Sequence, residues 1–361
     1  MFSRRLVRKI FVGRVAVGGD APVSVQSMTN TDPLDAEATL AQICQLQEAG
    51  CDIVRVTFPE AAALPAFKKI VDGSPIPVVA DIHFDGSLAI LALDNGAACV
   101  RINPGNIRNL DQVADIARCA IANHRPVRIG VNAGSLAPEV LKRYRHPCAE
   151  ALVESAVHYC DFFEKQGCGD LKVSLKAADV RTTVEASRLF AARTDYPLHI
   201  GVTEAGTATT GIIKSAAALG ALLLDGIGDT LRVSLTAPPV EEVRAGIRIL
   251  EAIGQRQAKP EIVSCPTCGR TRIDLLPLAT AVEAEIDRLK AEGYEIGMNR
   301  IALMGCVVNG PGEAREADFG IAGGDGEGVI FRNGKVVAKI AEAELLPAVI
   351  AELRACAKKP I

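Results

Sequence analysis

The strongest constraint on the fold is a series of eight short apolar segments in the first two thirds of the chain. They span residues 23–28, 52–58, 77–83, 98–104, 127–135, 171–177, 198–206 and 230–236. The segments between them, such as 35–50, 110–123 and 148–167, carry apolar residues at spacings of three and four, which is typical of amphipathic helices that cover a parallel sheet. Eight such units in a row predict an α/β fold, a closed (β/α)8 TIM barrel that ends near residue 258.

The main alternative to a barrel is an open, doubly wound parallel sheet. The chain has no G-x-G-x-x-G motif after its first apolar segment, and this absence disfavours a sheet of the dinucleotide-binding type. We therefore expect the barrel.

Residues 259–361 differ in pattern and predict a smaller α+β domain. They contain a Cys-rich turn, a helical pattern over 277–292, a glycine-rich loop and a last helical pattern over 343–357. Asn333-Gly334 lies between alternating apolar residues, which predicts a β-hairpin with a type I′ turn. The expected domains are therefore 1–258 and 259–361.

Composition excludes several classes of protein. The chain has 361 residues, of which 49% are hydrophobic and 23% charged, as expected for a folded globular protein. Its net charge of −3 implies no general attraction to nucleic acid or to anionic membranes. No apolar run reaches about 18 residues, and the basic N-terminal segment lacks the apolar core of a signal peptide. We expect a cytoplasmic protein without a nucleic-acid partner or a membrane segment.

Polar residues recur on the predicted strands two or four positions apart, so that each set shares one face of its strand. Their apolar neighbours would face the helices, which directs the polar residues into the barrel. Active sites of TIM barrels lie at the C-terminal ends of the strands. The candidate site residues there are Arg55, Asp81, His83, Arg101, Asn103, Arg128, Asn132, Ser174, Lys176, His199, Glu204, Arg232 and Ser234.

Five of these residues are cations from different strands: Arg55, Arg101, Arg128, Lys176 and Arg232. Arg forms bidentate contacts with phosphate oxygens, and so many cations around one small ligand favour a diphosphate over a monophosphate. The alternative is a salt-bridge layer inside the barrel, with acids drawn from Asp81, Glu204, Asp225 and Asp229. The absence of a Walker A motif disfavours a nucleotide-driven phosphotransferase.

Three of the eleven cysteines stand out by their spacing. Cys265 and Cys268 form a C-x-x-C turn, and Cys306 lies in a glycine-rich turn with Glu313 seven residues later. A structural zinc usually needs four Cys or His ligands, and a thioredoxin-like redox pair would not need Cys306. A cubane iron–sulfur cluster held by three thiolates, with an oxygen ligand or none on the fourth iron, also fits. Spacing alone leaves three possibilities open: a cluster, a zinc site and cysteines without a shared role.

Several motifs together resemble one family over nearly the whole chain. They are VSVQSMTNTD, VRINPGN, VRIGVNAGS, LHIGVTEAG, DGIGDTLRVSL, SCPTCGRT and GCVVNGPGEAREADFGIAGG. The chain resembles the bacterial 4-hydroxy-3-methylbut-2-en-1-yl diphosphate synthases of the methylerythritol phosphate route to isoprenoids. The resemblance implies an iron–sulfur oxidoreductase that converts 2-C-methyl-D-erythritol 2,4-cyclodiphosphate to (E)-4-hydroxy-3-methylbut-2-enyl diphosphate.

The resemblance also implies particular ligands and partners. A [4Fe–4S] cluster is expected on Cys265, Cys268 and Cys306, with Glu313 as a fourth ligand that the substrate displaces. Electrons are expected from a flavodoxin or a ferredoxin, and the family forms homodimers. The substrate-binding residues implied are Arg55, Arg101, Asn103, Arg128, Asn132, Lys176, Arg232 and Ser234.

A proton must reach the hydroxyl group that leaves the substrate. Glu204 is the expected donor because it stands where the seventh strand ends, with His199 and Asn309 as further candidates. Two other functions remain as alternatives: a redox-inert barrel enzyme stapled by zinc, such as an aldolase or an isomerase, and a non-enzymatic iron–sulfur sensor. The sensor would need a basic partner-binding surface, which the charge of −3 does not suggest.

Overall fold

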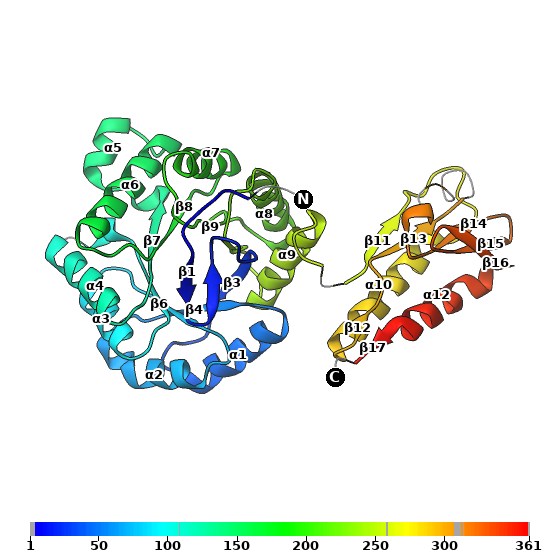
Figure 1. Cartoon of the computed structure of the whole chain (residues 1–361), viewed down its shortest axis with the longest axis horizontal. Helices are drawn as coiled ribbons and strands as arrows, with labels where there is room; N and C mark the ends of the chain where they lie inside the picture. Colours follow the sequence, from blue (N-terminus) through cyan, green and yellow to red (C-terminus); the bar gives the residue numbers. More distant parts are fainter. Residues whose placement is uncertain (1–3, 108, 258, 307–311, 313, 360–361) are drawn as a thin grey trace. The chain divides into compact units, whose positions relative to one another are not determined.

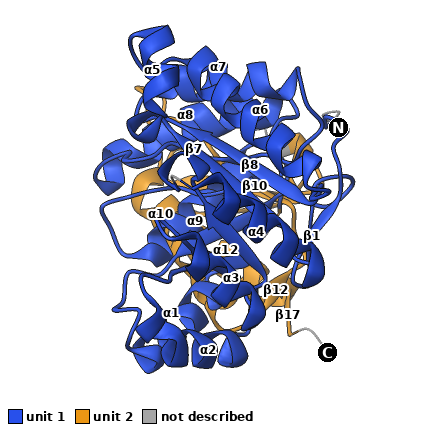
Figure 2. Cartoon of the chain, turned by 90° about the vertical axis from the view of Figure 1, so that its left-hand side faces the viewer, with its two compact units in different colours: residues 1–256 blue, residues 257–361 orange. Residues whose placement is uncertain are grey.

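The computed structural model describes residues 4–107, 109–257, 259–306, 312 and 314–359. The chain forms two compact units, Met1–Arg256 and Gln257–Ile361 (Figure 2). This division falls two residues before the expected domain boundary. Each unit has its own hydrophobic core.

The first unit is a parallel eight-stranded barrel, which confirms the predicted fold (Figure 1). All eight apolar segments supply a strand, in the spatial order β8-β7-β6-β5-β4-β3-β10-β9. A further parallel bridge between Val173 and Leu198 joins the two edges of this sheet and closes it. The strands are β3 (Ser24–Met28), β4 (Ile53–Thr57), β5 (Val78–Asp81), β6 (Cys99–Ile102), β7 (Val127–Asn132), β8 (Leu171–Lys176), β9 (His199–Ile200) and β10 (Thr230–Leu231).

Helices surround the strands and bury their apolar sides in one large core (Figure 1). Short 3-10 turns follow three of the strands: η1 (Ala61–Ala63), η2 (Pro104–Asn106) and η3 (Ala133–Ser135). The helices are α1 (Ala36–Glu48), α2 (Leu64–Gly73), α3 (Gly86–Asp94), α4 (Leu110–Ala122), α5 (Pro138–Tyr144), α6 (Ala149–Lys165), α7 (Val180–Ala191), α8 (Ala208–Leu224) and α9 (Pro239–Ala252).

Local sequence signals set where these helices begin and end. The carboxylates of Asp35 and Asp179 accept hydrogen bonds from the amides of Ala38 and Thr182, at 3.0 and 2.7 Å, and so cap α1 and α7. Gly50 follows α1 with φ +96°, a conformation that glycine adopts without strain. The two carboxylates thus fix where α1 and α7 begin, and Gly50 fixes where α1 ends.

An N-terminal hairpin closes the floor of the barrel. Its strands β1 (Ile10–Val12) and β2 (Val15–Val17) are antiparallel. One buried apolar cluster joins the hairpin residues Ile10, Val12 and Val17 to Ile53 and Val79. Ile53 and Val79 lie in the N-terminal halves of β4 and β5. The N-terminal ends of the strands are therefore filled with apolar side chains.

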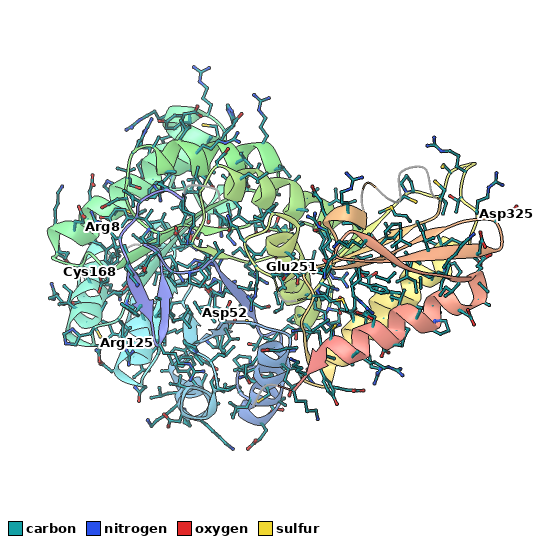
Figure 3. All side chains as sticks on the ribbon, turned by 45° about the vertical axis from the view of Figure 1, so that its right-hand side comes forward. Arg8, Asp52, Arg125, Cys168, Glu251 and Asp325 are labelled. Carbon is teal, nitrogen blue, oxygen red and sulfur yellow. The ribbon has the colours of Figure 1, made fainter. Side chains whose placement is uncertain are left out.

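The chain segment before this hairpin is fixed to the outside of the barrel. The guanidinium of Arg8 lies 4.3 Å from the centre of the Tyr196 ring and pairs with Glu164 and Asp195 at 2.7 and 2.8 Å. Figure 3 labels Arg8 on the barrel unit. Arg5 donates to three main-chain carbonyl oxygens at the end of α7 and just after it, at 2.6 to 2.8 Å. These contacts fix the chain segment that leads into the hairpin.

The second unit is a five-stranded mixed sheet with two long helices, which confirms the smaller α+β domain. Strands β11, β13 and β14 are parallel, and β15 and β16 are antiparallel to their neighbours. Its elements are β11 (Glu261–Ser264), α10 (Leu275–Ala291), β12 (Glu295–Ile296), β13 (Arg300–Met304), η4 (Ala314–Glu316), β14 (Phe319–Gly323), β15 (Glu327–Arg332), β16 (Lys335–Ala341), α12 (Glu342–Cys356) and β17 (Ala357–Lys358).

The predicted hairpin lies between β15 and β16. Arg332 pairs with Lys335, and the two residues between them have positive φ, +48° at Asn333 and +74° at Gly334. Positive φ at both central positions defines the expected type I′ turn. None of the helices in the described ranges is both long enough and apolar enough to span a bilayer.

Candidate active site

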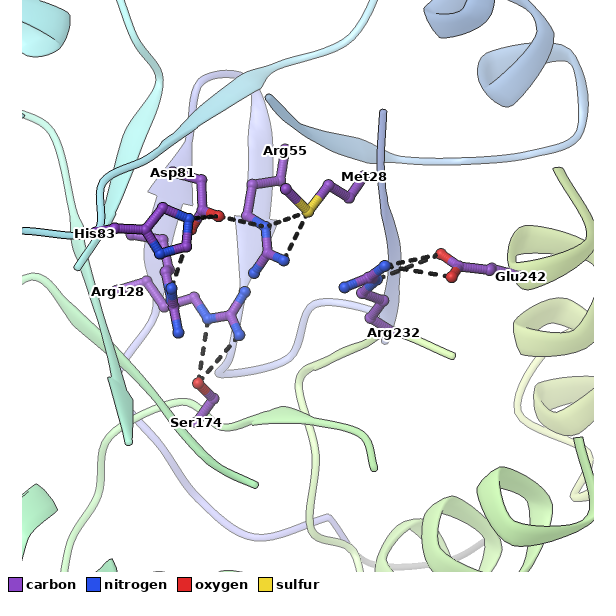
Figure 4. Close-up of polar contacts among 9 residues, drawn as sticks. Met28, Arg55, Asp81, His83, Arg128, Ser174, Arg232 and Glu242 are labelled. Carbon is purple, nitrogen blue, oxygen red and sulfur yellow. Dashed lines mark hydrogen bonds and ion pairs between the residues drawn. The ribbon is translucent and has the colours of Figure 1, made fainter. Parts of the chain in front are cut away.

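The five predicted cations lie on β4, β6, β7, β8 and the segment directly after β10. Figure 4 shows three of them, Arg55, Arg128 and Arg232. Strand register makes them neighbours, because Asp81 pairs with Arg101, Arg101 with Arg128, and Asn132 with Lys176. Four of the cations are buried, and the side chain of Arg232 is 18% exposed. The charges therefore gather in a low-dielectric space where each one needs compensation.

Asp81 compensates two of the cations. Its carboxylate lies 3.2 Å from Nη1 of Arg101, 3.8 Å from Nε of Arg55 and 3.2 Å from Nε2 of His83. Burial opposes ionisation of Asp81, but Arg55, His83 and Arg101 outweigh it and hold its pKa well below the ordinary value. Arg55 also donates to the thioether of Met28, and burial lowers the pKa of Arg55 to about 10.

Glu242 compensates Arg232 and was not among the residues expected from sequence. It lies in the first turn of α9, where its two carboxylate oxygens accept from Nε and Nη2 of Arg232 at 3.2 to 3.3 Å. Glu242 is the one acid on the buried, otherwise apolar side of α9, beside Val243 and Gly246. An acid within an apolar stripe is the signal that could have identified it.

The other cations have no acid partner in the described residues. Arg128 donates to the hydroxyl of Ser174 at 3.0 and 3.3 Å, and its Nη1 is buried without a partner. Lys176 forms no ion pair within the described ranges, and burial, followed by Arg128 and Arg232, lowers its pKa well below the ordinary value. The strand ends thus carry more positive than negative charge, which fits an anionic ligand.

The expected alternative, a complete salt-bridge layer, is only partly realised. Of the four acids considered, Asp81 alone pairs with the site cations. Asp229 pairs with Arg4 at 2.7 Å, and Asp225 pairs with Arg188 at 2.7 Å on the outer surface. Glu204 is exposed and forms no ion pair within the described part of the chain.

A cleft of ≈ 520 Å³ opens beside Arg101, which is the one member of these five cations that lines it. Asn103 lies in its wall and donates to the hydroxyl of Ser135 at 2.7 Å, which fixes its side chain. Glu204 lies in the loop after β9 with φ +51°, a strained conformation for a residue with a side chain. The cleft is lined by His83, Arg101, Asn103, Asn106, Asn132, Ala133, Gly134, Ser135, Pro147, Ala178, Thr203 and Glu204.

Two further polar residues lie deeper inside the barrel. His199 is fully buried, its ring nitrogens have no partner in the described residues, and burial, then Arg128 and Lys176, lowers its pKa well below the ordinary value. A neutral, buried imidazole is poorly suited to donate a proton at the cleft. Lys172 is also fully buried and was missed, although it stands two residues before Ser174 and so shares its inward face.

Three of the predicted site residues remain. Ser234 is half-buried in the segment after β10, two residues beyond Arg232. Asn309 and Glu313 lie outside the described residues.

Two of the three predicted cysteines follow neighbouring strands of the second unit's sheet. Cys265 follows β11 and Cys306 follows β13, and these strands are parallel neighbours. The amide of Gly305 donates to Sγ of Cys265 at 3.2 Å, while the Cys268 amide donates to Thr271 at 3.0 Å. Backbone and side-chain hydrogen bonds from Arg270 lower the pKa of Cys268.

The donor set fits an iron–sulfur cluster, although the described side chains are not yet arranged around one. All eleven cysteines are free thiols, and thiolates are the ligands of such clusters. The Gly305 amide that donates to Cys265 is the kind of hydrogen bond that stabilises a ligating sulfur. In the described ranges, no three His, Cys, Asp or Glu side chains converge closely enough to bind a metal.

Comparison with known proteins identifies the family. A model described as the GcpE TIM-barrel domain matches residues 7–247, and one described as the GcpE protein C-terminal domain matches residues 261–355. The chain belongs to the GcpE family. GcpE proteins are iron–sulfur oxidoreductases named 4-hydroxy-3-methylbut-2-en-1-yl diphosphate synthase, which confirms the family expected from the motifs.

The curated relatives match this GcpE chain from end to end. The enzyme 4-hydroxy-3-methylbut-2-en-1-yl diphosphate synthase (flavodoxin) of Desulfotalea psychrophila is 53% identical over 98% of this chain and 96% of its own length. The enzyme of the same name from Geobacter sulfurreducens is 56% identical over 96% of each chain. Among solved structures, Plasmodium falciparum HPPK-DHPS aligns with a TM-score of 0.50 at 11% identity, covering 69% of this chain and 50% of that one, which shows likeness of fold alone.

Proposed function

We propose that the barrel of this chain binds 2-C-methyl-D-erythritol 2,4-cyclodiphosphate through its strand-end cations and that the cysteines of the second unit hold a [4Fe–4S] cluster. The reaction is the family's conversion of this substrate to (E)-4-hydroxy-3-methylbut-2-enyl diphosphate. The observation that carries the proposal is the excess of buried cations over acids beside a cleft of ≈ 520 Å³. It supports an anionic ligand independently of the family.

The cations have two tasks in this reaction. Arg101 lines the cleft and is proposed to contact the diphosphate, while Arg128 and Lys176, which lack acid partners in the described residues, add uncompensated positive charge together with Arg55 and Arg232. The conversion consumes two electrons and one proton, opens the ring at a C–O bond to phosphate and releases the C3 hydroxyl as water. The freed diphosphate gains one negative charge, which fixed cations in a buried site stabilise.

The substrate's departing hydroxyl needs a proton, and we assign its delivery to Glu204. Its position in the cleft wall, after β9, supports this role. The depressed pKa and deep burial of His199 make it a weaker candidate, and it lies outside the cleft lining. Asn103 and Asn132 line the cleft and are proposed to orient the substrate, together with Ser234.

The cluster ligands proposed are Cys265, Cys268 and Cys306, with Glu313 on the remaining iron. When bound, a [4Fe–4S] cluster would supply the substrate with electrons one at a time. The flavodoxin in the relatives' printed names supports a flavodoxin or ferredoxin as donor, and we propose a homodimer. Eleven free thiols suit a reducing compartment, so we place the enzyme in the cytoplasm.

Anaerobic purification followed by iron, sulfide and zinc analysis tests the cofactor. We expect about four irons and about four sulfides per chain, with broad absorption near about 400 nm. Cys268→Ala should lose the cluster, while Cys356→Ala, a matched change at a cysteine far along the sequence from this turn, should retain it. One zinc without sulfide, even after reconstitution, would overturn the cluster.

Turnover of the cyclic diphosphate with an artificial electron donor tests the reaction. Glu204→Gln should keep the iron content and lower turnover by about 100-fold, the usual contribution of a positioned acid. Undiminished turnover would remove Glu204 from proton delivery. If the intact, cluster-loaded wild type leaves the cyclic diphosphate unchanged, the proposed reaction itself is wrong.

A further inference from the structure

Glu242 connects three parts of the molecule that the active site depends on. Besides Arg232, its carboxylate accepts from the amide of Leu235 at 3.0 Å and from the hydroxyl of Ser27 at 3.1 Å. Glu242 itself belongs to α9, Ser27 to β3, and Leu235 to the segment that carries Ser234. One buried carboxylate thus joins a helix, a strand and the loop after β10.

Arg232 cannot hold its position without a partner. Leu231 and Val233 belong to the core under the helices, so Arg232 points to the other side, toward the barrel axis. There it lies close enough to Arg55 and Lys176 that its charge lowers the pKa of both. Repulsion from these cations would push a free guanidinium outward, and the two-pronged contact with Glu242 opposes that movement.

The carboxylate of Glu242 is buried, and both of its oxygens accept hydrogen bonds. Glu242 is 4% exposed, and its two oxygens together accept from Arg232, the Leu235 amide and Ser27. A buried, fully hydrogen-bonded pair of this kind defines one geometry. We infer that Glu242 is a positioning residue, which holds Arg232 in place for the substrate diphosphate.

This inference rests on the proposed function, because a positioned Arg232 matters only if the barrel binds a diphosphate. It extends the site from the strand ends to a helix of the outer ring. Glu242 acts through Arg232, so removing it should weaken binding only while Arg232 is present.

A double-mutant cycle measured on the full-length chain tests this dependence. The readout is the dissociation constant of the cyclic diphosphate, measured by calorimetry on the oxidised enzyme without turnover. Glu242→Gln keeps the side-chain shape but not the charge, and it should raise this constant by about tenfold, the factor typical of a lost charged hydrogen bond. In an Arg232→Met background the same change should raise it by less than about twofold.

Matched variants separate positioning from folding. Glu241→Gln alters the neighbouring residue, which pairs with Arg244 on the outer side at 2.8 Å, and should bind the substrate like wild type. Glu242→Asp keeps the charge on a shorter side chain and should recover part of the lost affinity. Melting temperatures measured beside each titration report whether a variant is folded.

Each result decides the question. An equal loss in the wild-type and Arg232→Met backgrounds would show that Glu242 acts on the fold alone and would overturn the inference. Wild-type affinity in Glu242→Gln would overturn it as well. If wild type itself fails to bind the cyclic diphosphate, the proposed function fails instead, and the two failures are distinct.

Discussion

Replacing Asp81 by Asn should destabilise the barrel strongly, because it removes the negative charge between two buried arginines. The wild-type carboxylate lies 3.2 Å from Arg101 and 3.8 Å from Arg55, with a side chain only 2% exposed. Losing one partner of a buried ion pair costs about 3–5 kcal/mol. We expect the lower value, about 3 kcal/mol, because Asn keeps a carbonyl oxygen that can still accept from Arg101.

The expected change can be measured as a melting temperature. For a unit of this size, each kcal/mol corresponds to about 2–4 °C, so Asp81→Asn should melt about 6–12 °C below wild type at neutral pH. Asp225→Asn is the matched control, because Asp225 pairs with Arg188 at 2.7 Å on the surface. Loss of such an exposed pair costs about 0–1 kcal/mol.

The pH dependence gives an independent check on the cause. The folded pKa of Asp81 is depressed, so its stabilisation is complete above the ordinary Asp value, about 4, and is lost as pH falls toward the folded pKa. The gap between wild type and Asp81→Asn should therefore shrink below about pH 4. The variant should also gain more thermal stability from inorganic pyrophosphate, which replaces the missing charge.

Two results would refute this reasoning. A melting temperature equal to that of wild type at neutral pH would show that the arginines do not depend on Asp81. A gap of the same size at pH 3 and pH 7 would show that the loss comes from packing and not from charge.

Three further predictions concern other parts of the molecule. Lys172→Met should raise the melting temperature at pH 7, because burial disfavours the charged lysine and lowers its pKa to about 8. Wild type should recover this stability between about pH 8 and pH 10, where Lys172 loses its proton more readily in the folded than in the unfolded state. Gly130→Ala should weaken pyrophosphate binding by about tenfold, since the new Cβ would lie 2.7 Å from Nε of Arg101, whereas Gly134→Ala, with nothing within 4 Å, should bind normally in the same titration. Gly334→Ala should destabilise the second unit by about 1–3 kcal/mol in chemical denaturation, because φ is +74° and the Cβ would lie 2.7 Å from a main-chain oxygen.

The barrel could be predicted because two patterns, a short apolar strand segment and a helix with apolar residues at spacings of three and four, are repeated eight times. Alternation along the strands also identified the inward residues, since a position two residues from Arg101 or Lys176 must share their face. The hairpin turn at Asn333-Gly334 followed from turn chemistry alone. These features depend on local sequence, and local physics determines them.

The features that were missed depend on contacts between distant elements. Glu242 lies ten residues from Arg232, on a helix, and the two side chains meet only after α9 packs beside β3. The position of Lys172 on its strand already placed it on the inward face, but only the closed barrel shows that its Nζ has no hydrogen-bond partner among the described residues. The Gly305 amide meets Cys265 only through the register of two parallel strands, which sequence spacing does not specify.

The N-terminal hairpin closes one end of the barrel with apolar side chains, so the barrel opens at the other end. The side chains of Ile10, Val12 and Val17 pack against the N-terminal parts of the barrel strands and fill this end with apolar groups. Substrate and product must then pass through the same mouth, and each blocks the other while it is inside. We expect the product diphosphate to inhibit turnover competitively with the substrate. Rigid polyanions that fit into the open end of the barrel should inhibit turnover in the same way.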